Sequence, residues 1–321
     1  MHTRSHVRLL TAALVAAGVV LAGCGSNNSS DSASGSSNSG SGGWDTASIT
    51  GDVGTDATVT FDGEVTDSTQ STKVLSEGSG DKVQQGDSLI LQTVIADGTT
   101  QKTVASSYQD KQPQVVTLSS SVQKLFLDAL QDKPIGSRVA VYSPAEAIFG
   151  PSGNASLGIS QQDPILIVFD LVGKPVSQPD GKQHAAPSWA PKIEKSKGVI
   201  SGFDFSKTPK PDGALHSAAL YDGTGPEVKK GQTIFARYLG EVYNGKKPFD
   251  ENFSGSDPAT FQIGTGNVIK GWDKSLVGQH VGSEVVLAIP PQDGYGKKGS
   301  PSAGIKGTDT LYFVVDIVGA A

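Results

Sequence analysis

The sequence has 321 residues with a net charge of −6, because 32 acidic side chains outnumber 26 basic ones. An acidic chain of this kind argues against nucleic acid as a partner. The single cysteine excludes an internal disulfide, and the five histidines lack the spacing of metal ligands, so we expect neither a metal site nor another cofactor.

Residues 1–23 have the pattern of a bacterial lipoprotein signal peptide. Two arginines precede a run of apolar or small residues, Leu9–Leu21, which is too short to cross a bilayer as a helix. The run ends at "LAGC", which resembles the site where a signal peptidase cuts before a lipid-modified cysteine. We therefore expect Cys24 to carry a lipid that holds the protein on the extracytoplasmic face of the cell membrane. The alternative is an ordinary secretory signal followed by a chance cysteine.

Residues 24–43 form a tract rich in serine and glycine that lacks the apolar side chains of a folded core. We interpret this tract as a disordered tether. As a flexible coil it would span roughly 25 Å on average, enough to hold the following domains away from a membrane surface.

The rest of the chain contains one unit twice. "IGSRVAVYSPAEAIFGPSG" at Ile135 aligns without gaps with "VGSEVVLAIPPQDGYGKKG" at Val281, and "PILIVFDLVG" at Pro164 aligns with "TLYFVVDIVG" at Thr310. Both pairs lie 146 residues apart, and an upstream pair of segments lies 145 residues apart. A slip of a single residue over such a length indicates a duplicated domain.

The repeats divide the chain into a first copy at residues 44–173 and a second copy at residues 199–321. Between them, residues 174–198 are rich in proline, glycine and charge. This composition predicts an extended and exposed linker.

Both copies have the pattern of antiparallel strands. In "TIFARYLGEVY", residues 233–243, alternate positions are mainly apolar, and "EVVLAIPP" and "TLYFVVDIVG" are short runs rich in β-branched residues. Only "NVIKGWDKSLVG" and its counterpart "SVQKLFLDALQD" have helical spacing. Each copy is therefore predicted to be an α+β domain with one short helix against a sheet.

Over about residues 215–319 the second copy resembles the FKBP-type peptidyl-prolyl cis-trans isomerases. The resemblance rests on "ARYLGEVYNGKKPFDEN", "FQIGTGNVIKGWDKSLVGQHVGSEVVLAIPPQDGYGKKG" and the closing "LYFVVDIVG". It implies two FKBP-like domains, each a bent antiparallel sheet wrapped over one short helix. It also implies prolyl isomerase activity without a cofactor. The implied partners are proline-containing segments of secreted or surface proteins, and macrolides such as FK506 and rapamycin.

The resemblance carries the family's functional positions onto the second copy. The positions expected to act in catalysis are Tyr238, Asp250 and Tyr295, and those expected to bind substrate are Phe249, Phe261, Val268, Ile269, Trp272 and Ile305. As in the family, Trp272 would form the floor beneath a proline ring. The Ile269 N–H and the Tyr295 hydroxyl would hold peptide carbonyls, and Asp250 would lie against the rotating amide or anchor Tyr238.

Two departures from the family pattern affect the expected pocket wall and its covering loop. Ala259 stands where the family often has phenylalanine, and Ser300 follows "YG" where some members place a histidine. Taken alone, Trp272 is more typical of a core and Asp250 of a solvated turn. Their joint occurrence in family order and spacing favours a pocket.

The first copy lacks the polar groups of that pocket. The offsets place Thr93, Val104, Ala105, Phe126 and Phe149 where the second copy has Tyr238, Phe249, Asp250, Trp272 and Tyr295. We therefore predict that the first copy keeps the fold and has little or no catalytic activity.

Two other classes of function remain open. One is a non-catalytic chaperone or peptide-binding lipoprotein in which both domains hold extended apolar segments. The other is the solute-binding lipoprotein of a transporter, which would require two α/β lobes and is disfavoured by the strand-rich repeats.

Overall fold

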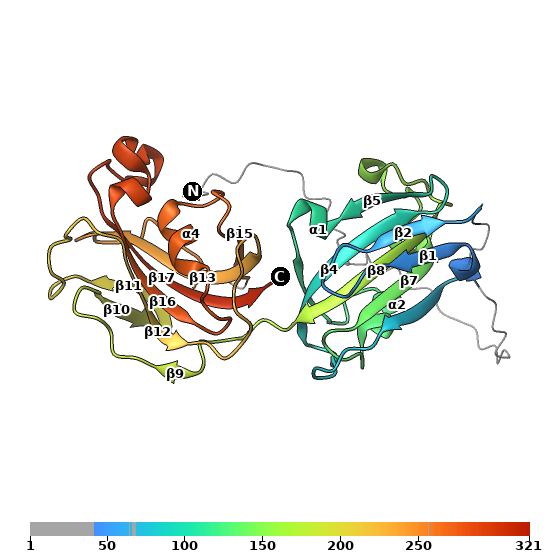
Figure 1. Cartoon of the computed structure of the whole chain (residues 1–321), viewed down its shortest axis with the longest axis horizontal. Coiled ribbons are helices and arrows are strands. Elements are labelled where there is room, and N and C mark those ends of the chain that lie inside the picture. The colour runs from blue at the N-terminus through green and yellow to red at the C-terminus, as the bar shows by residue number, and fades with distance from the viewer. Residues whose placement is uncertain (1–41, 64, 66–68, 256) are drawn as a thin grey trace. The chain divides into compact units, whose positions relative to one another are not determined.

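The computed structural model describes residues 42–321, except residues 64, 66–68 and 256. The predicted signal peptide, Cys24 and all but the last two residues of the predicted tether lie outside the described residues. The described chain forms two compact units, a first unit of residues 42–174 and a second unit of residues 175–321 (Figure 1). Within the described ranges, no helix combines the length and the apolar character that a membrane crossing requires.

The first unit is built on an antiparallel sheet with the strand order β3-β7-β8-β4-β5, in which β6 also pairs with β4. Two further strands, β1 and β2, pair with each other. The strands are β1 (Ala47–Thr50), β2 (Thr58–Phe61), β3 (Ser71–Ser76), β4 (Ser88–Asp97), β5 (Lys102–Ser106), β6 (Gln114–Thr117), β7 (Arg138–Pro144) and β8 (Pro164–Gly173). The helices are η1 (Gly42–Asp45), α1 (Ser107–Asp110), α2 (Lys124–Leu130), α3 (Ala145–Phe149) and η2 (Ala155–Leu157).

The second unit repeats this sheet with the strand order β14-β13-β17-β16-β12-β9, in which β15 also pairs with β13. The strands are β9 (Lys182–Gln183), β10 (Lys192–Ser196), β11 (Val199–Asp204), β12 (His216–Asp222), β13 (Thr233–Val242), β14 (Asp250–Glu251), β15 (Ala259–Gln262), β16 (Glu284–Ile289) and β17 (Leu311–Ala320). The helices are α4 (Lys270–Leu276), η3 (Pro291–Asp293), η4 (Gly296–Lys298) and η5 (Pro301–Ala303).

The α+β prediction is confirmed, and the two helices that the sequence predicts are α2 and α4. Each of them begins directly after a residue with extended backbone, Gln123 and Ile269 respectively. The prediction of a single helix in the first copy was incomplete, because α1 and α3 are also present. α1 is one short turn, capped by the Ser106 hydroxyl, which accepts a hydrogen bond from the Gln109 N–H.

Alternation along the strands gives each sheet two apolar faces. In the second unit, Ala236 and Tyr238 on β13 face the side on which α4 packs, whereas Leu239 faces the opposite side. The first unit has the same arrangement, with α2 on one side and residues such as Val94 on the other. A sheet that is apolar on both faces must be covered twice.

The second cover is a β-hairpin that replaces part of the predicted linker. β10 pairs with β11, and residues of β11 and the segment after it, including Ile200, Phe203 and Phe205, pack on the sheet face opposite α4. The hairpin turns at Lys197 and Gly198, both with positive φ, which is the geometry of the tight turns that suit a twisted hairpin. All of the predicted linker except Lys174 is therefore part of the second unit, and it includes β9 and β10.

A matching hairpin, β1–β2, covers the first unit. Val59 on β2 packs with Val94, Ala140 and Val168 on the face opposite α2. β1 begins at Ala47 and β10 at Lys192, a separation that matches the upstream repeat offset. The duplicated unit therefore begins with this covering hairpin, earlier than the sequence match alone indicates.

Candidate active site

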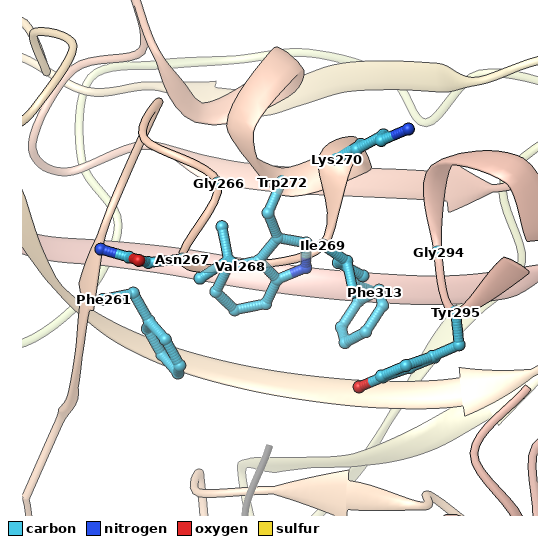
Figure 2. Close-up of a pocket in the computed structure, with 10 residues that line it drawn as sticks. All are labelled: Phe261, Gly266, Asn267, Val268, Ile269, Lys270, Trp272, Gly294, Tyr295 and Phe313. Carbon is cyan, nitrogen blue, oxygen red and sulfur yellow. The ribbon is translucent and has the colours of Figure 1, made fainter. Parts of the chain in front are cut away.

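A cavity of about 390 Å³ lies in the second unit beside α4. Figure 2 shows its lining residues: Phe261, Gly266, Asn267, Val268, Ile269, Lys270, Trp272, Gly294, Tyr295 and Phe313. Trp272 lies at its centre, with Phe261 to one side and Tyr295 to the other. The lining is mainly apolar and aromatic, as is usual for a site that binds a small organic group.

Trp272 is held by three aromatic rings. Its ring centroid lies 4.9 Å from that of Phe261, 5.5 Å from that of Tyr238 and 5.4 Å from that of Phe313, with nearly perpendicular planes in each case. Edge-to-face packing of this kind stabilises by about 0.5–1.5 kcal/mol for each pair beyond area burial. The rings therefore fix the indole in one orientation at the cavity floor.

The indole Nε1 of Trp272 has no hydrogen-bond partner among the described residues, although the side chain is only 2% exposed. An unpaired buried donor costs about 1–3 kcal/mol. The ring packing around Trp272 offsets that cost. A tryptophan placed only for core packing would usually have its N–H paired.

Two glycines allow this packing. A Cβ added at Gly271 would lie 2.6 Å from Cγ2 of Ile289, so α4 approaches β16 closely only because position 271 has no side chain. A Cβ at Gly240 would lie 2.5 Å from the ring of Phe313 and 2.7 Å from that of Phe249. Both glycines are therefore required by close approach in the cavity wall.

The lip of the cavity is the loop before α4, and Asp273 holds it. The Asp273 carboxylate accepts hydrogen bonds from the N–H groups of Gly264 at 2.6 Å and Gly266 at 2.7 Å. Both glycines have positive φ. No hydrogen bond from the Ile269 N–H, which follows this loop, reaches a described residue. This donor is available to a bound carbonyl.

The three residues predicted to act in catalysis are two tyrosines and a carboxylate. The Tyr238 hydroxyl donates to Oδ2 of Asp250 at 2.7 Å. Burial, and next the bond to Asp250, raises the pKa of Tyr238, and burial together with the charge of Asp250 raises the pKa of Tyr295 to about 12. Both hydroxyls are therefore protonated donors at neutral pH. Tyr295 extends its hydroxyl toward the middle of the cavity (Figure 2).

The structure brings most of the predicted site residues together. Of the predicted set, Phe261, Val268, Ile269, Trp272 and Tyr295 line the cavity. Tyr238 contacts two of the lining rings and holds Asp250 at the same site.

Two predicted substrate-binding residues are not among the lining residues. Phe249 packs edge-on against the lining residue Phe313, with 5.6 Å between the ring centroids. Ile305 lies in the hydrophobic core of the unit. Sequence reasoning also missed Phe313, because "LYFVV", residues 311–315, contains no charged residue and no alternation marks the residues that face the cavity.

The first unit has the same framework with different side chains. Ala105 pairs with Ile95 as Asp250 pairs with Gly240, so the carboxylate position is occupied by a methyl group. Thr93 lies opposite Phe169, whereas Tyr238 lies opposite Val315. In the first unit the large ring is therefore on β8 instead of β4, and Phe169 packs on Phe126 with 5.6 Å between the ring centroids.

The site offers apolar walls, two hydroxyl donors, an N–H group and one carboxylate. Among the described residues, no group of three or more histidine, cysteine, aspartate or glutamate side chains is placed to hold a metal ion. The cavity fits a small apolar ring with polar groups at its edge.

Comparison with known proteins identifies the family. Residues 225–318 match the family model of the FKBP-type peptidyl-prolyl cis-trans isomerases. An FK506-binding protein from Streptomyces anulatus is 35% identical over 109 residues, which cover 34% of this chain and 88% of the relative. The FK506-binding protein 4 of Aspergillus oryzae is 46% identical over 96 residues, 30% of this chain and 20% of that relative, so the match spans only a fifth of its length.

Among solved structures, the crystal structure of AtFKBP13 is 37% identical, with a TM-score of 0.31, over 33% of this chain and 93% of that one. The residues that match the family model include every residue that lines the cavity. The chain described here belongs to the FKBP-type peptidyl-prolyl cis-trans isomerase family.

Proposed function

We propose that the second unit catalyses cis-trans isomerisation of peptide bonds that precede proline, and that the first unit keeps the fold without useful catalysis. The observation that carries this proposal is the aromatic cavity over Trp272 with the Tyr238–Asp250 hydrogen bond at its edge. The first unit has threonine and alanine at the positions of Tyr238 and Asp250.

The chemistry requires no bond to be made or broken. Rotation about the prolyl amide has a barrier of roughly 18–20 kcal/mol because it destroys amide resonance. The planar amide separates charge between oxygen and nitrogen, and the twisted amide separates less. A cavity with apolar walls therefore disfavours the planar ground state more than the transition state.

The polar groups at the edge orient the substrate. The protonated Tyr295 hydroxyl and the Ile269 N–H are donors that can hold peptide carbonyls on either side of the ring. Trp272 supplies the surface on which the proline ring rests. The proposed role of Asp250, whose Oδ2 accepts the Tyr238 hydroxyl, is to act on the rotating amide.

The clients that we propose are secreted or surface proteins, because the sequence begins with a lipoprotein-like signal. A lipid on Cys24 would hold both units on the extracytoplasmic face of the membrane. The Cys24→Ala variant should then be unprocessed or released from the membrane while both units still fold. Membrane fractionation and mass analysis of the N-terminus test this, and a variant that is still cleaved and membrane-bound contradicts the assignment.

The catalytic proposal is tested on the full chain with a proline-containing peptide assay. Asp250→Ala should lower kcat/KM at least tenfold, or about 1.4 kcal/mol of transition-state stabilisation. Adding Tyr295→Phe should bring the rate close to the uncatalysed one, since only the first unit would remain intact. Uncatalysed isomerisation takes tens to hundreds of seconds, so small residual activity is measurable.

The matched control is Thr93→Ala, which alters the first-unit position equivalent to Tyr238 and should leave kcat/KM unchanged. Wild-type activity in the Asp250→Ala and Tyr295→Phe double variant would contradict the assignment of catalysis to these groups. Absence of activity in the wild-type chain would favour a non-catalytic binding function for both units.

A further inference from the structure

The outer edge of β13 has a gap in its hydrogen-bond ladder beside the candidate site. Ala236 on β13 pairs with Ala259 on β15, and Leu239 pairs with Glu251 on β14. Tyr238 lies between these two ladders. Its backbone would be left without a regular strand partner on this edge.

Asn252 fills that gap with its side chain. Its Oδ1 accepts a hydrogen bond from the Tyr238 N–H at 2.7 Å, and its Nδ2 donates to the Ala236 carbonyl at 3.0 Å. The Asn252 N–H also donates to the Tyr238 carbonyl at 3.0 Å. A primary amide has one acceptor and one donor side, so it can replace a peptide group of a neighbouring strand.

The contacts form a closed ring around the polar pair of the site. Asn252 fixes the backbone of Tyr238, and Asp250, two residues before Asn252, receives the Tyr238 hydroxyl at 2.7 Å. Any shift of Asn252 therefore moves Asp250 and Tyr238 relative to each other. A catalytic group displaced by a fraction of an ångström loses much of its effect.

The first unit has a simpler form of the same contact. Ser107, at the position equivalent to Asn252, accepts from the Thr93 N–H at 2.7 Å and donates its hydroxyl to Oε1 of Gln92. A serine hydroxyl at this position therefore suffices to hold the strand. The second bond, from Nδ2 of Asn252 to the Ala236 carbonyl, is made in the unit that contains the Tyr238–Asp250 pair.

We infer that Asn252 is a positioning residue that sets the Tyr238–Asp250 pair for catalysis, beyond its part in the fold. This inference rests on the proposed isomerase activity of the second unit. The bond to the Ala236 carbonyl is the part of the contact that serves the site, because the first unit folds without an equivalent from Ser107.

The test uses Asn252→Ser in the full chain, which introduces the residue of the first unit at the same position. Folding should be retained, while kcat should fall roughly three- to tenfold, the range expected for the loss of one hydrogen bond. KM should stay unchanged, because the aromatic walls are not altered. Ser107→Ala, which removes the corresponding contact in the first unit, is the matched control and should leave kcat unchanged.

A double-mutant cycle with Tyr238→Phe separates positioning from a general structural role. If Asn252 acts through the Tyr238–Asp250 bond, the effect of Asn252→Ser should shrink to less than twofold once that bond is absent. An unchanged kcat in Asn252→Ser overturns the inference, and so does an equal loss in both backgrounds. An inactive wild-type chain instead refutes the proposed isomerase activity, and urea unfolding of each variant identifies losses that come from unfolded protein.

Discussion

The close approach of α4 to β16 explains why Gly271 precedes Trp272, the tryptophan at the cavity floor. Gly271 and Ile289 face each other in the second unit, and the first unit has Leu125 and Ser143 at the equivalent positions. In the first unit the large residue, Leu125, is on the helix and the small one, Ser143, is on the strand. In the second unit the small residue, Gly271, is on the helix and the large one, Ile289, is on the strand. The two arrangements fill the same space, but only the second places a bulky strand residue beneath the start of α4.

The first prediction concerns this pair. Gly271→Ala should destabilise the second unit by about 1–3 kcal/mol, because the new methyl group overlaps Ile289 in a packed core. Ile289→Ser alone should also be destabilising, since it leaves a cavity. Combined, the two changes should cost less than their sum. Urea unfolding with hydrogen exchange of second-unit peptides measures all three free energies.

The control for this cycle is Gly266→Ala. Position 266 has positive φ but no neighbour within 4 Å of an added Cβ, so Ile289→Ser should not relieve its effect. An additive result for Gly271→Ala and Ile289→Ser would show that the two positions do not share the space that the packing indicates.

At the same scale, the sequence predicts the site residues that belong to a motif and misses those that depend on packing. Trp272 and Asp250 are found because they occur in order with the surrounding glycines and prolines. Phe313 lies in a run of residues that does not alternate between polar and apolar, so the sequence does not show which side of the strand it faces. Asn252 resembles any polar turn residue. The role of Asn252 becomes visible only when β14 and β15 are seen to flank Tyr238.

At the scale of elements, the covering hairpins show where composition misleads. Residues 192–198, "KIEKSKG", have enough lysine and glycine to suggest a linker, yet they supply one strand and the turn of a hairpin. Ile193, Ile200 and Phe203 of that hairpin pack against the sheet. The turn at Lys197 and Gly198 was a local signal for a hairpin. The need for a second cover could not be predicted without knowing that the sheet is apolar on both faces.

The second prediction tests this cover. Phe203→Ala should destabilise the second unit by about 3–5 kcal/mol, the usual cost of removing a buried phenylalanine ring. The kcat/KM of the folded fraction should be unchanged, because Phe203 lies on the sheet face opposite the cavity. Urea unfolding and the peptide assay measure the two effects separately.

The control is Val199→Ala in the same hairpin, where the side chain is 42% exposed. Its effect should stay within about 0.5 kcal/mol. A loss of activity in folded Phe203→Ala beyond the loss of stability would mean that the hairpin influences the cavity through the sheet.

At the scale of the whole molecule, the two units differ in a buried pair of charged residues on the central strands. In the first unit Arg138 forms a buried double ion pair with Asp170, at 2.6 Å from Nε and 2.7 Å from Nη2, and also donates to the carbonyls of Gly51 and Thr55. The equivalent cross-strand pair in the second unit is Glu284 and Asp316, two carboxyl groups that are each 7% exposed.

Two adjacent buried carboxyl groups change how the second unit responds to pH. Burial, and next the charge of Glu284, raises the pKa of Asp316 to about 8, while burial raises the pKa of Glu284. Lys195 on β10 and Arg237 on β13 face the pair and oppose the shift. Two neighbouring carboxylates repel each other when both are ionised, so the buried pair keeps one proton to a higher pH than an isolated carboxyl group would.

The sign of the stability effect follows from the raised pKa. Below about pH 4, Asp316 is protonated in both the folded and the unfolded chain, so its favourable contribution is fully present. Between about pH 4 and pH 8 the unfolded chain releases this proton while the folded unit keeps it, and stability falls as pH rises. Above about pH 8 both states are ionised and this contribution no longer changes.

The third prediction is that this pH dependence belongs to the second unit alone. Hydrogen exchange of the full chain at pH 5 and pH 7.5, corrected for intrinsic rates, should show a loss of stability in second-unit peptides that Asp316→Asn reduces. Asp316→Asn should reduce the slope of the free energy of unfolding against pH by no more than about 1.4 kcal/mol per pH unit, the value for one proton. Glu241, whose pKa burial also raises, adds a slope that the substitution leaves in place.

Asp170→Asn is the matched change in the first unit. It should destabilise at both pH values, because it leaves the buried Arg138 without its partner. If Asp316→Asn left the slope of the second unit unchanged, the shared proton would not be the source of the pH dependence.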